Sequence, residues 1–190
     1  MMLASQLRTG MAVQYEGQSY KVIAAEYHPG QGKMGGVSHV RLKNLDTGTQ
    51  WETSLRADLK LEELPLEKKP MAFLYADEGF CFFMDPDTCE QAEVAQEQIG
   101  EAAKFLMPEM RVSVEFLGEK PVSVQLPGII EVRVDDTAPP MHGQTDSNWK
   151  PALLENKAEV MVPQFIKSGD SIRLDLTTLK YMDRVKAGAR

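Results

Sequence analysis

The chain has little cysteine, few aromatic residues and no long apolar run. Only 2 of its 190 residues are cysteine, and 7% are aromatic. Two cysteines are too few for the disulfide framework of a small secreted protein, and no run of about 18 apolar residues predicts a membrane span. The first residues also lack the basic-then-apolar order of a signal peptide. We therefore expect a cytoplasmic protein that does not associate with membranes.

The chain also lacks the motifs of common enzyme and metal sites. Its histidines, His28, His39 and His142, have no cysteine spaced near them, as a zinc site of the usual type would require. There is no Gly-x-Ser-x-Gly nucleophile elbow, and no neighbouring residue in the sequence is a general base for Lys33. Because the carboxylates are scattered, we expect no catalytic residue, no metal and no bound cofactor.

The charge is distributed unevenly along the chain. The net charge is -7, and the acidic excess lies in residues 65–128, which hold five basic and twelve acidic side chains. Residues 1–64 hold seven of each sign, and residues 129–190 hold nine of each. The two outer thirds can therefore still present basic faces to a phosphate backbone, whereas the middle third is a solvated acidic module.

Short segments of alternating apolar and polar residues predict an all-β chain of three small barrels. We expect domains at 1–64, 65–128 and 129–190. One helix is predicted over residues 93–105, where apolar residues recur on one side, and the long loop 135–151 is of a length typical of functional loops. The predicted strands are 10–15, 19–27, 37–45, 51–55, 71–75, 80–84, 111–116, 122–126, 129–134, 159–163, 171–176 and 179–182.

A glycine-rich stretch, Pro29-Gly30-Gln31-Gly32-Lys33-Met34-Gly35-Gly36, lies between two of these strands. Its glycines satisfy the G-x-G-x-x-G pattern, but a dinucleotide site needs a helix directly after them, and residues 37–45 alternate as a strand. A kinase would need the tripeptides His-Arg-Asp and Asp-Phe-Gly, and neither occurs. The stretch therefore predicts a hairpin loop that carries Lys33 away from its barrel.

Six segments spread along the chain match one known family. They are Lys150–Asn156, Val162–Asp175, Tyr181–Lys186, Leu7–Met11, Arg41–Gly48 and Phe83–Asp85. In these segments the chain resembles bacterial translation elongation factor P, whose family includes the hypusine-containing initiation factor of archaea and eukaryotes. The resemblance covers essentially the full length.

The resemblance implies an N-terminal SH3-like (KOW-like) barrel followed by two OB-fold barrels, in an L-shaped, tRNA-like arrangement. It also implies a monomer that binds ribosomal RNA and peptidyl-tRNA between the peptidyl-tRNA (P) site and the exit (E) site of the ribosome. Members of the family promote peptide bond formation on ribosomes stalled at consecutive prolines. Two alternatives stay open: a divergent paralogue with other stalling targets, and a ribosome-independent RNA chaperone built from OB folds.

The family pattern makes the glycine-rich hairpin the expected contact with the peptidyl-transferase centre. In the common pattern the tip is Pro-Gly-Lys-Gly, and its lysine is often enzymatically extended. Here the tip comprises Gly30, Gln31, Gly32, Lys33 and Met34, with Gln31 at the position of that lysine. We expect Lys33 to replace it and to be the candidate target of a lysine-modifying enzyme. The alternative is a solvated Lys33, with Gln31 or backbone groups contacting the RNA.

A second expected contact lies in the C-terminal third. Gly143, Gln144 and Thr145 match in part a Gly-Asp-Thr run of a family loop that approaches the mRNA codon in the exit site. Tyr181 and Arg184 match the end motif of the family in type and spacing. An aromatic ring and a guanidinium can contact RNA by stacking and by phosphate pairing. The alternative for Tyr181 is packing against the edge of the barrel.

Overall fold

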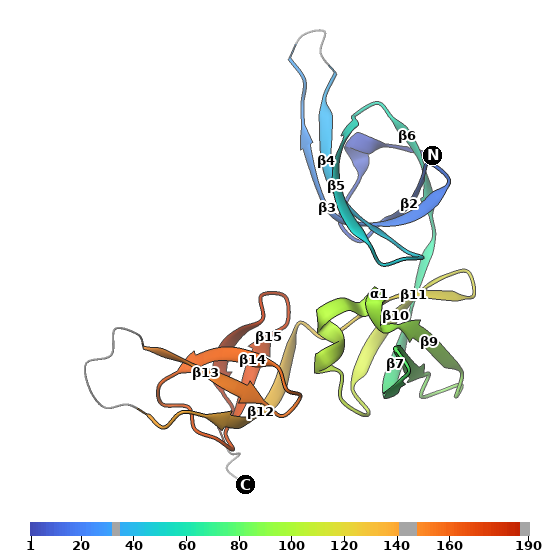
Figure 1. Cartoon of the computed structure of the whole chain (residues 1–190). Coiled ribbons are helices and arrows are strands. Elements are labelled where there is room, and N and C mark those ends of the chain that lie inside the picture. Colours follow the sequence, from blue (N-terminus) through green and yellow to red (C-terminus); the bar gives the residue numbers. More distant parts are fainter. Residues whose placement is uncertain (32–34, 141–147, 187–190) are drawn as a thin grey trace. The chain divides into compact units, whose positions relative to one another are not determined.

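The computed structural model describes residues 1–31, 35–140 and 148–186 of the chain. Nearly all regular structure in these residues is β-strand, arranged in three sheets (Figure 1). The predicted all-β fold class with three small β domains is therefore confirmed. The chain divides into two compact units, Met1–Gly100 with Met107–Gln125 and Glu101–Leu106 with Leu126–Arg190. None of the helices in the described residues is long and apolar enough to cross a membrane.

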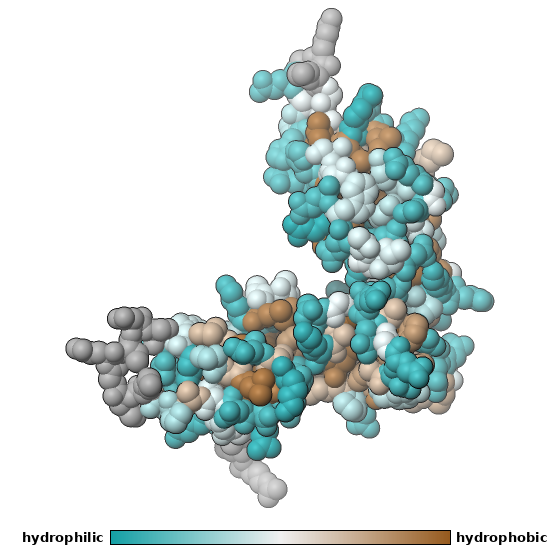
Figure 2. All heavy atoms as spheres, in the orientation of Figure 1, coloured by the Kyte–Doolittle hydropathy of each residue, from teal (hydrophilic) through white to brown (hydrophobic). Residues whose placement is uncertain are grey.

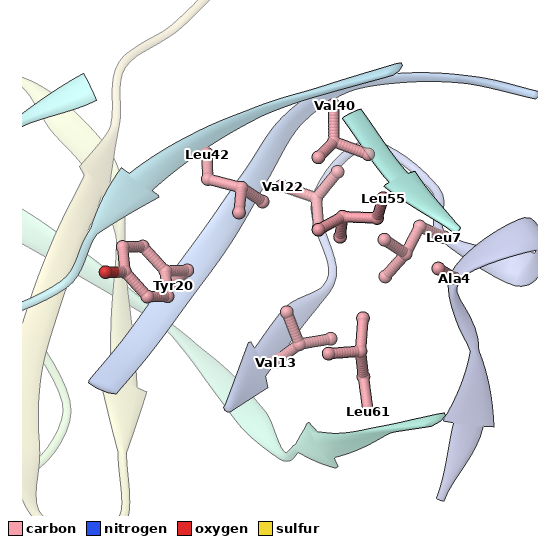
Figure 3. Close-up of a cluster of buried hydrophobic side chains, with 9 residues drawn as sticks. All are labelled: Ala4, Leu7, Val13, Tyr20, Val22, Val40, Leu42, Leu55 and Leu61. Carbon is pink, nitrogen blue, oxygen red and sulfur yellow. The ribbon is translucent and has the colours of Figure 1, made fainter. Parts of the chain in front are cut away.

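The N-terminal sheet has the strand order β1-β6-β2-β3-β4-β5. Its elements are β1 (Met2–Leu3), the 3₁₀ turn η1 (Ala4–Gln6), β2 (Ala12–Tyr15), β3 (Gln18–His28), β4 (Val37–Asn44), β5 (Gln50–Arg56) and β6 (Lys60–Leu64). Alternate side chains of these strands point inward and form one apolar core. Figure 3 shows that core, which comprises Ala4, Leu7, Val13, Tyr20, Val22, Val40, Leu42, Leu55 and Leu61.

A two-residue turn joins β2 to β3 and fixes their register. Tyr15 pairs with Gln18, and the two residues between them, Glu16 and Gly17, have φ angles of 49° and 78°. Positive φ at both central residues is typical of a type I′ turn, whose twist matches that of a β-hairpin. The Glu-Gly dipeptide thus sets where β3 begins.

The middle sheet has the strand order β11-β10-β7-β8-β9. Its strands are β7 (Leu66–Asp77), β8 (Phe80–Met84), β9 (Gln91–Ala95), β10 (Arg111–Leu117) and β11 (Lys120–Gln125). Phe83 and Val114 are fully buried, and Val94 is almost fully buried. These residues come from three different strands, so the core of this barrel lies between them.

The helix predicted over residues 93–105 is wrong in its first part. Residues up to Ala95 belong to β9, because Ala92 and Val94 are both buried and β9 pairs with β8. The α-helix α1 (Gln96–Ile99) is four residues long, and the rest is the 3₁₀ segment η2 (Gly100–Phe105). Gly100 has a φ of 76°, a conformation that interrupts a right-handed helix.

The C-terminal sheet has the strand order β14-β13-β12-β15-β16. Its strands are β12 (Ile129–Thr137), β13 (Trp149–Leu154), β14 (Glu159–Pro163), β15 (Ser171–Asp175) and β16 (Lys180–Arg184). Its core consists of fully buried aliphatic side chains, namely Val134, Leu154, Val162, Ile166, Ile172 and Leu174. Figure 2 shows hydrophobic patches among the hydrophilic side chains of the surface, and the exposed apolar residues of this sheet include Trp149 and Met161.

Candidate functional site

The β3–β4 hairpin extends beyond the N-terminal barrel (Figure 1). At its base, Val22 and Leu42 pair across the strands and are fully buried. The pairing continues to His28 opposite Val37, where the residues of β3 are exposed. A β-bulge interrupts the register just after Val22. Because a bulge bends a strand and increases its twist, it lies where the hairpin leaves the core.

Besides the pairing of β4 with β5 over residues 37–43, two further hydrogen bonds attach the outgoing strand to the barrel. The buried hydroxyl of Ser38 donates to the carbonyl of Ala4 at 2.9 Å, and the amide of Ala57 donates to the carbonyl of Gly36 at 2.9 Å. Gly36 also lies close to the opposite strand, since a Cβ placed on it would be 2.9 Å from the carbonyl oxygen of His28. The glycine therefore allows the two strands to approach at the end of their pairing.

Polar side chains cover the face of the hairpin stem. The rings of His28 and His39 meet edge to face, with centroids 5.0 Å apart. The Oγ of Ser54 lies 2.7 Å from Nδ1 of His39, and Oε1 of Glu26 lies 3.5 Å from Nε2 of His28. Glu26, His39 and Ser54 border an open hollow of about 590 Å³ that also includes Arg41. Imidazole and guanidinium groups there can donate hydrogen bonds to phosphate or sugar oxygens.

The predicted tip residues fall partly within the described structure. Gly30 and Gln31 are exposed at the end of β3. Gly32, Lys33 and Met34 lie outside the described residues. The stem therefore leads to the predicted tip, and the assignment of Lys33 stays a prediction.

In the C-terminal barrel, Tyr181 lies on β16 beside an exposed tryptophan. The ring centroids of Tyr181 and Trp149 are 6.2 Å apart at an interplanar angle of 76°. Together with Met161 and Leu179 they line a largely apolar groove of about 540 Å³. Burial raises the pKa of the Tyr181 phenol, as does the charge of Asp183. Tyr181 thus packs at the edge of the barrel and still faces an accessible groove.

Arg184 lies on the same strand but faces a different hollow. Its guanidinium carbon lies 5.9 Å from the centroid of the Phe165 ring, and its Nη1 lies 3.8 Å from the carboxylate of Asp170. The hollow around it is formed by residues 169–171 and 184–186. The sequence predicts that Tyr181 and Arg184 both contact RNA. In the structure each of them lines a different hollow.

A buried lysine holds the base of the long loop in this barrel. Lys150 is 4% exposed, and its ammonium donates a hydrogen bond to the carbonyl of Ala138. Burial lowers the pKa of Lys150, and the charge of Asp170 partly offsets this. The Oγ1 of Thr137 also donates to the carbonyl of Pro151 at 3.0 Å. The predicted codon-contact residues Gly143, Gln144 and Thr145 lie beyond this base, outside the described residues.

The described residues contain no group of three or more histidine, cysteine or acidic side chains placed to hold a metal ion. The sequence does not predict two features of the candidate sites, the Trp149 side of the apolar groove and the Phe165 ring beneath Arg184. Both are large apolar residues, which residue type alone assigns to a core. A signal for Trp149 exists in the alternation along β13, where Lys150 is buried and its neighbours are exposed.

Comparison with known proteins gives matches along almost the whole chain. Three family models match in succession: the elongation factor P KOW-like domain over residues 3–61, the elongation factor P OB domain over residues 66–124, and the elongation factor P C-terminal domain over residues 130–184. The three matches fall on the three sheets.

Curated relatives match over a similar extent. Elongation factor P of Pelagibacter ubique is 36% identical over 183 residues, which cover 96% of this chain and 98% of the relative. Elongation factor P of Clostridium acetobutylicum is 37% identical, with coverage of 98% and 100%. Among solved structures, eukaryotic translation initiation factor 5A from Methanococcus jannaschii is 18% identical with a TM-score of 0.46, covering 66% of this chain and 90% of that chain.

Proposed function

Because the chain belongs to the elongation factor P family, whose members act in translation elongation, we propose that it stimulates peptide bond formation on ribosomes stalled at consecutive prolines. It binds between the P and E sites and positions the peptidyl-tRNA. The observation that carries this proposal is the succession of three family matches over residues 3–61, 66–124 and 130–184. Relatives named elongation factor P that align over 96% or more of the chain support it.

The physical basis of the proposal is positioning of the reactants. Proline is a poor nucleophile and a conformationally restricted donor, so its reaction depends strongly on how the tRNA end and the nascent chain are held. Fixing two reactants in a productive geometry removes an entropic part of the barrier. The ribosome carries out the chemistry, and the factor contributes contacts with RNA rather than a catalytic side chain.

In this proposal the hairpin delivers the contact with the CCA end of the peptidyl-tRNA. The end of β3 is exposed and free to contact RNA. The hydrogen bonds of the Ser38 hydroxyl and the Gly36 carbonyl attach the stem to the barrel. Lys33 supplies a point charge suited to a phosphate and is the proposed substrate of a modifying enzyme. Intact mass measurement of the protein purified from its native host, followed by peptide mapping, tests this: added mass on the peptide with Lys33 supports it, and an unmodified chain opposes it.

The C-terminal barrel supplies a second RNA contact in this proposal. The ring of Tyr181 borders an accessible groove next to Trp149, and a base can stack on such aromatic surface. Arg184 can reach a phosphate from the adjacent surface, where it is half exposed. The loop with Gly143, Gln144 and Thr145 is proposed to approach the exit-site codon.

Substitution at the tip tests the role of Lys33. Lys33→Ala is expected to lower synthesis of a polyproline-containing protein about 10-fold or more, since a charged hydrogen bond contributes about 1.5–3 kcal/mol. Gln31→Ala is the matched control and is expected to have a much smaller effect. Unchanged polyproline synthesis with Lys33→Ala would overturn the assignment, and a larger loss with Gln31→Ala would transfer the role to Gln31.

Ribosome profiling with and without the protein tests which stalls it relieves. Loss of the protein is expected to increase ribosome occupancy at runs of two or more prolines. New stalls at other motifs, with prolines unaffected, would assign the chain to a paralogue with different targets. Failure to co-sediment with ribosomes, together with tight binding to free RNA, would contradict the ribosomal role.

A further inference from the structure

A buried carboxylate lies where the two barrels of the first unit meet. Glu115 of β10 is 1% exposed, and its Oε2 accepts a hydrogen bond from the ammonium of Lys21 on β3. Its Oε1 has no hydrogen-bond partner among the described residues, although the Lys68 ammonium lies 3.6 Å away. Burying a carboxylate is costly unless it is paired. The ion pair with Lys21 is thus the main compensation for this charge.

Strand alternation explains why Glu115 faces away from its own core. Val114, the preceding residue, is fully buried in the middle barrel, and successive side chains of a strand point to opposite faces. Glu115 therefore points to the outer face of β10, where Lys21 of the N-terminal barrel contacts it. An acidic residue on an outer face is normally solvated, so its burial here results from the meeting of the barrels.

Other contacts between the same two barrels surround the ion pair. The side-chain amide of Gln98 donates to the carbonyls of Leu45 at 2.9 Å and Asp46 at 3.2 Å. Lys43 donates in turn to the carbonyl of Gln98, and the ammonium of Lys120 lies 2.5 Å from the carboxylate of Asp46. A small apolar cluster of Ala12, Leu45 and Val122 completes the interface, with Leu64, Leu66 and Leu117 packed against it.

One glycine shows how closely the barrels approach. A Cβ on Gly48 would lie 2.9 Å from the carbonyl oxygen of Glu97, and the φ of Gly48 is +74°. Both the conformation and the space therefore favour glycine. Burial also lowers the pKa of Lys43, helped by the charge of Lys21 and opposed by that of Glu115. The interface is thus close-packed and partly dehydrated.

The geometry assigns Lys21 and Glu115 a positioning role: we propose that their ion pair fixes the direction in which the β3–β4 hairpin leaves the two-barrel unit. Lys21 and the end of the hairpin share one strand, β3. The seven residue-to-residue steps from Lys21 to His28 span about 23 Å at about 3.3 Å per residue. A rotation of about 10° at the ion pair therefore displaces the end of the stem by about 4 Å. The apolar cluster is small and non-directional, and among the directional contacts the Lys21–Glu115 pair is the one that joins β3 to a carboxylate buried to 1% exposure in the middle barrel.

The expected effect on stall rescue rests on the proposed function, whereas the orienting role of the ion pair rests on the contacts between the barrels alone. Placement errors of about 1 Å can cost a reaction up to about 100-fold. Loosening the ion pair is therefore expected to reduce the maximal rate of stall rescue, rather than the affinity for the ribosome, which depends on many separate contacts.

Distance measurement between two spin labels tests the orientation directly. One label is attached to the exposed Cys89 of the middle barrel and the other to Glu26→Cys on the stem, where the side chain is 75% exposed. Cys81 is buried and reacts little. In the full chain, Glu115→Gln and Lys21→Met are each expected to shift or broaden the distance distribution by about 4 Å or more. Changes below about 2 Å in both variants would overturn the proposal.

Lys68→Met is the matched control, because it removes a lysine near the same carboxylate without removing a contact between the barrels. It is expected to leave the distance distribution unchanged. The double variant Lys21→Met with Glu115→Gln is expected to be no worse than either single variant, since both remove one interaction. Additive effects, or an equal effect of Lys68→Met, would show that the pair is not the orienting contact.

Stall rescue is measured on the same proteins. Glu115→Gln and Lys21→Met are expected to lower the rate at saturating factor about 10-fold or more, with the half-saturating concentration changed less than about threefold. A change confined to the half-saturating concentration would contradict the positioning role. If the unaltered protein fails to rescue stalls, the proposed function fails, and the distance measurements still decide the orientation because they need no ribosome.

Discussion

Replacing Gly36 by alanine perturbs the hairpin stem at one defined point. The added Cβ would lie 2.9 Å from the carbonyl oxygen of His28 and 2.7 Å from the ring of Tyr27. The Tyr27 ring is about half exposed and can turn away, but the carbonyl belongs to the paired backbone of β3. Ordinary contact with a Cβ begins near 3.4 Å, so the strands must separate by about 0.5 Å.

Overpacking of this kind costs about 1–3 kcal/mol. The neighbouring Gly35→Ala is the matched control, because a Cβ there meets nothing within 4 Å and the φ of Gly35 is not positive. It is expected to be neutral or to stabilise the chain by up to about 1 kcal/mol, through a less flexible unfolded state. Urea unfolding measures both variants, and a stall-rescue assay reports whether the altered stem also lowers activity.

For a domain of this size, about 1 kcal/mol corresponds to a shift in Tm of about 4–8 °C. Gly36→Ala is therefore expected to lower the Tm of the transition that includes the N-terminal barrel, and to lower stall rescue further than the loss of folded protein explains. Equal stability of the Gly36→Ala and Gly35→Ala variants would refute the close approach of the strands at Gly36.

Three further perturbations test the core, a turn and the apolar groove. Leu42→Ala, at a fully buried position, is expected to cost about 2–5 kcal/mol in urea unfolding; a cost below about 1 kcal/mol would contradict the core of Figure 3. The amides of Asp87 and Thr88 lower the pKa of Asp85, so this contribution to stability is present above pH of about 4 and is lost as the pH falls through the folded-state pKa. Asp85→Asn keeps an acceptor that does not titrate, so the protection factors of those amides, taken relative to the intrinsic exchange rate at each pH, should no longer fall in acid; an unchanged fall would contradict the assignment. Trp149→Ala is expected to expose Tyr181 and return its phenol pKa toward about 10, which ultraviolet titration measures; an unchanged pKa would show that Trp149 does not bury the ring.

The β-strands could be predicted from the sequence because burial follows a local pattern. In 19–27 and 37–45 every second residue faces the barrel, and the structure places β3 and β4 over nearly the same ranges. The start of the helix is harder to predict, because Val94 fits a helical face with Ile99 and Ala102 and also alternates with Ala92 as in a strand. Pairing of β9 with β8 decides in favour of the strand, and that pairing is a tertiary interaction.

The candidate sites could be predicted only in part. Tyr181 and Arg184 follow from the family motif, but their separate surroundings depend on Trp149 and Phe165, which lie on other segments of the barrel. Glu115 gives no local signal at all, since an acidic residue in a strand is ordinarily solvated. Its burial depends on Lys21, which is 94 positions away, and local periodicity carries no information about such a contact.

Peptide bond formation on ribosomes paused at three consecutive prolines is the decisive measurement. Single-turnover rates are compared with and without the protein, on a proline message and on a matched message without prolines. We expect a rate increase of about 10-fold or more on the proline message and little change on the other. Equal rates with and without saturating protein on the proline message, despite demonstrated ribosome binding, would contradict the proposed function.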